Sequence, residues 1–131
     1  MSMSEDTAKD TTWDVLDRRT VDDLVAKDGA DRVLGALMSD DPAPEDRVQL
    51  MVELAVAGNI PALRHETQTF QAWAERHGLR RLINALVELD RVLDLSQRGQ
   101  AVLQAQALTR FIRQNLSHDI AAFKRAVSSS K

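Results

Sequence analysis

Apolar residues recur every three or four positions along most of the chain, the spacing that places them on one face of an α-helix. The clearest stretches run from Val48 to Ala55, from Leu79 to Leu93 and from Val102 to Phe123. Residues 20–39 show the same spacing on both sides of Gly29, which predicts one bent helix or two short helices. The pattern therefore predicts an all-α protein.

Proline, glycine and capping residues mark the ends of these helices. The Asp- and Pro-rich segment 40–44 is the clearest break, and the helix that follows it is expected to end at Gly58. Asn59 is placed to cap the next helix, which Gly78 ends. Upstream, Thr20 is predicted to be an N-cap because acidic residues follow it in the first turn.

Four long helices joined by short loops, one of them at 96–100, are expected to pack antiparallel. The sequence thus predicts an antiparallel up-down four-helix bundle, with a short N-terminal helical segment at 20–39 that caps it. We expect a disordered polar tail at 1–12, a single helical domain at 13–128 and a frayed C-terminus at 129–131.

Composition narrows the functional classes. The length of 131 residues suits one domain, and the formal net charge of −3 gives no general attraction to nucleic acid or anionic lipid. The absence of cysteine excludes disulfides and thiolate metal sites. No apolar run approaches the ~18 residues needed to span a membrane, and the acidic N-terminus is not a secretory signal. We therefore expect a cytoplasmic protein that binds neither nucleic acid nor membrane.

Motifs of catalysis are missing from the sequence. It contains no Gly-rich phosphate loop, no nucleophile elbow and no zinc-ligand spacing. No Glu-x-x-His pair of the kind that builds di-iron sites in helical bundles is present. The three histidines, His65, His77 and His118, show no metal-ligand spacing. We expect no enzymatic activity, no metal and no cofactor.

The helix at 59–77 carries the most informative surface. Successive helical residues are rotated by about 100°, so an apolar face is formed by Leu63, Thr67, Phe70, Ala74 and His77. Gln68 lies about 140° from Leu63 and is expected to point outward at mid-helix. The residues expected around it are Arg64, Gln71, Ala72 and Glu75.

The register of this helix resembles that of histidine phosphotransfer (HPt) domains. Those domains carry His-Thr-Leu-Lys-Gly-Ser-Ala, followed by a glycine ten residues after the histidine. Here Gln68-Thr69-Phe70-Gln71-Ala72-Trp73-Ala74 is followed by Gly78, ten residues after Gln68. Leu82, Leu89 and Asp90 match the continuation of the pattern, and the resemblance extends over about 20–125. It implies an HPt-like helical bundle.

The departures from the family pattern all affect phosphate chemistry. Gln68 replaces the phosphorylatable histidine, and a primary amide has no nucleophilic ring nitrogen. Gln71 replaces the lysine that stabilises the phosphoryl charge in the family. Ala72 replaces the usual glycine, and Trp73 replaces a serine. The resemblance therefore implies a phosphorelay scaffold that has lost its chemistry.

The function implied is that of a non-catalytic pseudo-HPt signalling adaptor. Its expected partner is a response-regulator receiver domain or a histidine kinase of a two-component system, and its expected state is a monomer or weak dimer. The predicted docking surface consists of Arg64, His65, Gln68, Gln71, Ala72 and Glu75. Gln68 can form hydrogen bonds there but cannot react.

Two other functions remain open at this point. The chain can be a structural or assembly bundle unrelated to phosphorelay, in which case an exposed apolar patch is expected away from Gln68. It can also be a phosphocarrier that uses His65, one turn before Gln68. His118 and Asp119 are adjacent on a helix and do not face each other, so no catalytic dyad is implied.

Two local features also have alternative interpretations. Trp73 is either a packing residue at the boundary of the core or an aromatic anchor in an interface. A basic cluster, consisting of Arg76, His77, Arg80 and Arg81, is either solvated charge around a helix junction or a partner contact.

Overall fold

The computed structural model of the protein describes residues 12–95 and 99–129, and all regular secondary structure in these two ranges is helical. The prediction of an all-α protein is confirmed. The helices in chain order are α2 (Thr12–Val15), α3 (Arg18–Asp28), α4 (Ala30–Met38), α5 (Pro44–Ala57), α6 (Ile60–His77), α7 (Arg80–Leu95) and α8 (Gly99–Ser129). None of the helices described is long and apolar enough to cross a membrane.

The ends of α5 and α6 follow their predicted signals. Gly58 adopts the left-handed conformation, with φ 71°, and its N–H donates to the carbonyl oxygen of Ala55. The side chain of Asn59 accepts a hydrogen bond from the N–H of Ala62, at 3.3 Å, and so caps α6. Gly78 ends α6 with φ 67°, a conformation that a side chain disfavours.

Gly78 also allows a close approach between α6 and α3. A Cβ atom at this position would lie 2.9 Å from the Cβ of Thr20, which is too close for unshifted packing. The backbone N–H of Asp17 donates to the carbonyl oxygen of Gly78 at 2.7 Å. The lack of a side chain at Gly78 therefore allows α3 to pack closely against the end of α6.

The N-terminal helices agree with the prediction except at the N-cap of α3. Gly29 has φ 85° and ψ 148°, so 20–39 forms two helices rather than one bent helix. The prediction that Thr20 is the N-cap is wrong, because α3 already begins at Arg18 and Asp17 precedes it. Thr20 lies inside the first turn, where its hydroxyl donates to the carboxylate of Asp17 at 2.8 Å.

Several predicted boundaries lie near or outside the described residues. The predicted tail at 1–12 lies outside them except for Thr12, which begins α2. Of the predicted loop at 96–100, Gly99 and Gln100 instead belong to α8, and 96–98 lie outside the description. Of the predicted frayed end at 129–131, Ser129 is the last residue of α8.

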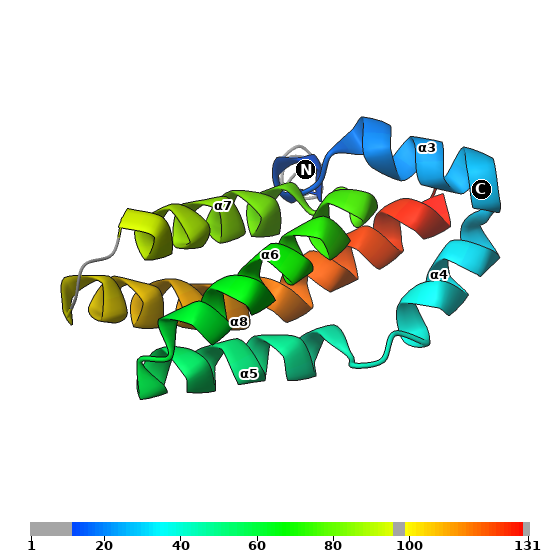
Figure 1. The fold of residues 1–131 in the computed structure, drawn as a ribbon. Helices are drawn as coiled ribbons and strands as arrows, with labels where there is room; N and C mark the ends of the chain where they lie inside the picture. Colours follow the sequence, from blue (N-terminus) through cyan, green and yellow to red (C-terminus); the bar gives the residue numbers. More distant parts are fainter. Residues whose placement is uncertain (1–11, 96–98, 130–131) are drawn as a thin grey trace, which may run out of the picture.

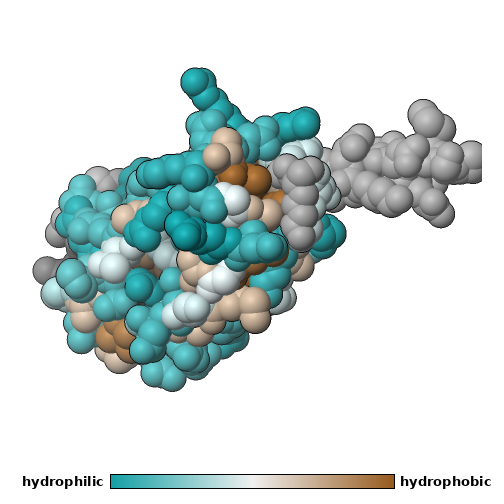
Figure 2. All heavy atoms as spheres, turned by 90° about the vertical axis from the view of Figure 1, so that its right-hand side faces the viewer, coloured by the Kyte–Doolittle hydropathy of each residue, from teal (hydrophilic) through white to brown (hydrophobic). Residues whose placement is uncertain are grey.

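The four longest helices run side by side (Figure 1). α5 packs against both α6 and α8, and α7 also packs against both α6 and α8. α6 and α8 therefore lie on opposite sides of the group, with α6 nearer the viewer in Figure 1. α3 and α4 pack against each other and against α8 at one end. Figure 2 shows that this end is largely hydrophilic, with only small separate hydrophobic areas.

Aromatic side chains of α6 and α8 meet in the core. The rings of Phe70 and Trp73 stack with centroids 5.2 Å apart, and His77 lies 4.6 Å from Trp73 and 5.4 Å from Phe123. The indole N–H of Trp73 donates to the carboxylate of Asp40 at 2.8 Å. Trp73 is only 4% exposed, so it is a packing residue and its interpretation as an interface anchor is wrong.

Candidate functional site

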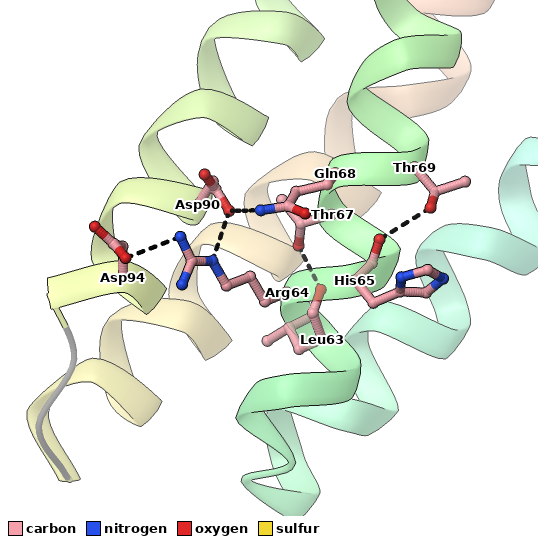
Figure 3. Close-up of polar contacts among 8 residues, drawn as sticks. All are labelled: Leu63, Arg64, His65, Thr67, Gln68, Thr69, Asp90 and Asp94. Atoms are coloured by element: carbon pink, nitrogen blue, oxygen red, sulfur yellow. Dashed lines mark hydrogen bonds and ion pairs between the residues drawn. The ribbon is translucent and has the colours of Figure 1, made fainter.

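Gln68 lies in the middle of α6 with its side chain exposed, in the direction that its angular position predicts. Its amide nitrogen Nε2 donates to Oδ1 of Asp90 on α7, at 3.1 Å. Figure 3 shows the amide turned from α6 toward the neighbouring helix.

Arg64, one turn before Gln68, contacts Asp90 and also Asp94 on α7. Its Nε donates to Oδ1 of Asp90 at 3.3 Å, and its Nη2 lies 2.8 Å from Oδ1 of Asp94 (Figure 3). Desolvation lowers the pKa of Arg64, but the charges and hydrogen bonds of Asp94 and Asp90 outweigh it and raise the pKa above its ordinary value. The guanidinium is thus already engaged by two carboxylates.

The remaining residues of the predicted surface lie along the outer side of α6. Gln71 is half-buried and donates through Nε2 to Glu75 at 3.2 Å, within the same helix. Ala72 is exposed and has a small side chain. His65 is exposed, and its backbone carbonyl accepts a hydrogen bond from the hydroxyl of Thr69 at 3.0 Å (Figure 3). We call the six predicted residues together with Asp90 and Asp94 the α6 surface.

The α6 surface is acidic. Its ionised groups are one cation, Arg64, and three anions, Glu75, Asp90 and Asp94, which gives a net charge of −2 with His65 neutral. No cation there is left free to stabilise a phosphoryl group, because Arg64 is paired with both aspartates. The arrangement can hold a partner by hydrogen bonds and charge but offers no nucleophile at position 68.

Sequence reasoning missed the roles of Asp90 and Asp94. The family pattern includes Asp90 without giving it a contact, and it does not include Asp94. Their spacing of four residues places them on one side of α7, which is a signal for a shared partner. That the partner is α6 depends on how the two helices pack.

The residues of the predicted basic cluster have different surroundings in the fold. His77 is buried, and its Nδ1–H donates to the carbonyl oxygen of Trp73 at 2.8 Å. Burial lowers the pKa of His77, against a smaller effect of that hydrogen bond. Arg81 pairs with Asp119 of α8, whereas Arg76 and Arg80 are exposed. The four residues therefore form no common surface.

The last helix separates His118 from its neighbour. His118 is exposed, while Asp119 is buried and bonded to Arg81, which agrees with the expectation that they form no dyad. In the described part of the chain, no group of three or more His, Asp or Glu side chains is placed to hold a metal ion.

Comparisons of the chain with models of protein families, with curated proteins and with solved structures found no match.

Proposed function

We propose that the protein is a non-catalytic signalling adaptor of the pseudo-HPt kind, which binds a receiver domain or a histidine kinase without relaying phosphate. The proposed architecture is an antiparallel up-down four-helix bundle of α5 to α8, capped by the N-terminal helices. The cyclic packing of α5, α6, α7 and α8 supports it, because each of these helices has two of the others as neighbours.

The observation that carries the proposal is an exposed, oriented amide at mid-helix. Gln68 stands ten residues before Gly78, and Asp90 holds its Nε2 from the next helix. Its amide oxygen forms no hydrogen bond with any residue of the described ranges, so it is available to a partner's donor. Exposed Ala72, one turn later, lets a partner approach α6 closely.

The charge of the α6 surface adds a requirement on the partner. Two carboxylates beyond the one that compensates Arg64 make this surface net acidic. An acidic receiver pocket is repelled there unless a divalent cation or a basic side chain lies between the two proteins. Neutralising both aspartates, Asp90→Asn with Asp94→Asn, is therefore expected to strengthen binding of a metal-free receiver pocket.

The first test is capture of partners from the native cell extract, identified by mass spectrometry. Wild type is compared with Ala72→Arg on α6 and with Ala26→Arg, a matched control at an exposed position of α3. A receiver protein or histidine kinase that binds wild type and Ala26→Arg but not Ala72→Arg would support the proposal. Equal capture of such a protein by wild type and both variants would show that the α6 surface is not its binding site.

The second test restores the lost chemistry. Gln68→His with Gln71→Lys replaces the two residues that differ from the family at the reactive positions. With a captured receiver in its phosphorylated form, this variant is expected to gain acid-labile phosphate, while wild type gains none. A variant that folds, binds the receiver and still accepts no phosphate would argue against an HPt-like docking geometry.

Two observations keep the alternatives testable. Exposed apolar residues away from α6, such as Leu103 and Phe111 on α8, favour an assembly role, although the α6 surface is not featureless. The exposure of His65 favours a phosphocarrier. Acid-labile phosphate on wild type that disappears in His65→Ala would establish the phosphocarrier and replace the adaptor proposal.

A further inference from the structure

The charge of the protein is unevenly distributed. The whole chain has a formal charge of −3, but α8 carries four cations, Arg110, Arg113, Lys124 and Arg125, against the single anion Asp119. α8 is therefore net positive by three charges on an acidic protein. Because α8 lies across the helix group from α6, this charge is on a different side from the α6 surface.

The four cations of α8 form no ion pairs within the described ranges. All four side chains are exposed. By contrast, Arg64 and Arg81 are paired across helices, with Asp90 and Asp119 among their partners. An unpaired row of cations along one helix attracts anionic groups from solution.

Apolar groups accompany this charge. Leu103 is 67% exposed and Phe111 is 43% exposed, both on α8. Phe111 also borders a groove of about 400 Å³ lined by Asp14, Arg81, Asn84, Ala85, Leu108 and Phe111. Its walls come from α2, α7 and α8, so the groove runs beside the exposed side of α8.

A part-buried ion pair lies at the wall of the groove. Arg81 donates through Nε and Nη2 to Oδ1 of Asp119, at 3.0 and 2.6 Å, which fixes its guanidinium at the groove wall. Asp14 places a negative charge at the α2 side. An acidic group is therefore disfavoured inside the groove, while an apolar side chain beside Leu108 and Phe111 is favoured.

We propose that α8 forms a second docking surface, for an acidic protein segment that carries an apolar anchor. This α8 surface consists of Leu103, Arg110, Phe111, Arg113, Lys124 and Arg125. The carboxylates of the segment pair with exposed cations of α8, and its apolar side chain enters the groove beside Phe111, on the flank of α8 that faces α7. Arginine and aromatic residues are enriched at protein interfaces, and arginine binds carboxylates with two parallel hydrogen bonds.

The observations favour a protein over a membrane or nucleic acid. Only two large apolar residues of α8 are strongly exposed, which is too few for an amphipathic helix to insert into lipid. The net charge of −3 opposes general attraction to a polyanion. A protein segment can instead place its charges opposite the cations and avoid the acidic remainder of the surface.

The consequence is a module with two binding surfaces. The α6 surface and the α8 surface lie on opposite sides, so one partner on each can be bound at the same time. The second surface does not depend on the function proposed for the first, because none of its residues is shared with the α6 surface.

The test uses the full chain and a synthetic helical peptide with one face of Glu and one face of Leu. A matched peptide with Gln in place of Glu is the control. Binding is followed by backbone amide chemical shifts and by titration at low and high salt. We expect saturable shifts confined to α8 and the groove, weaker binding at high salt and no binding of the Gln peptide.

Matched double variants locate the site. Arg110→Ala with Arg113→Ala is expected to weaken binding roughly tenfold. Arg19→Ala with Arg80→Ala removes two exposed arginines elsewhere and should leave binding unchanged. Equal weakening by both pairs, or shifts spread over α3 and α6, would overturn the proposal. So would tighter binding to phosphatidylserine vesicles or duplex DNA, since either would identify another class of partner.

Discussion

Two sets of ion pairs connect α7 to its neighbours, and they differ in burial. Toward α6, Asp90 and Asp94 hold Arg64, and the three side chains are 29%, 59% and 39% exposed. Toward α8, Arg81 holds Asp119, whose side chain is only 2% exposed. Both sets join helices that are neighbours in the fold, but they face different dielectric surroundings.

The difference decides which contacts are available for binding. Exposed ion pairs contribute little to stability, so a partner can displace the contacts of Arg64 at little cost. Burial raises the pKa of Asp119, and the hydrogen bond and charge of Arg81 only partly oppose this rise. The Arg81–Asp119 pair therefore does not fully compensate the desolvation of its carboxylate, yet loss of one member would leave the other unpaired.

The largest expected effect comes from breaking the buried pair. Arg81→Met leaves the carboxylate of Asp119 buried without its cation and should lower the free energy of unfolding by about 3 kcal/mol. Urea denaturation followed by circular dichroism measures the change. The double variant Arg81→Met with Asp119→Leu should recover to within about 1 kcal/mol of wild type, because it removes both charges. A double variant as unstable as Arg81→Met would show that packing, not charge, accounts for the loss.

A smaller effect is expected from pH. Because the folded pKa of Asp119 is raised, the folded state retains a proton that the unfolded state releases near its ordinary pKa of 3.8. The stability contributed by Asp119 is therefore complete below this pH and falls as the pH rises through the folded pKa. Wild type should lose stability relative to Asp119→Asn over this window. A relative gain with rising pH would mean that Arg81 stabilises the carboxylate more than burial disfavours it.

The smallest effect is expected at the exposed set. Asp90→Asn removes one charge from the partners of Arg64, but Asp94 remains within reach. The free energy of unfolding should fall by less than about 1 kcal/mol, and by less still at high salt. Thermal denaturation at two salt concentrations checks this. A loss as large as that of Arg81→Met would remove the distinction between the two sets of contacts.

Local features were predictable because they depend on neighbours in sequence. The ends of α5 and α6 at Gly58 and Gly78 and the cap at Asn59 follow from the preferences of glycine and asparagine. The exposure of Gln68 follows from helical periodicity and the apolar residues around it. The prediction for Thr20 is wrong because Asp17, another residue of the capping type, occupies the N-cap position three residues earlier.

The residue pattern alone predicts the long helices, their buried faces and the lack of a histidine at position 68, since each is a property of residues within one or two helical turns. Three contacts are visible only in the folded protein: Asp90 accepts from Gln68, Asp40 accepts from Trp73, and Arg81 pairs with Asp119, 38 positions away. Such partners depend on the packing register between helices, and residues far apart in the chain carry no local signal of it. The cations of α8 can be read from the sequence. Their lack of ion-pair partners within the described ranges is a property of the fold.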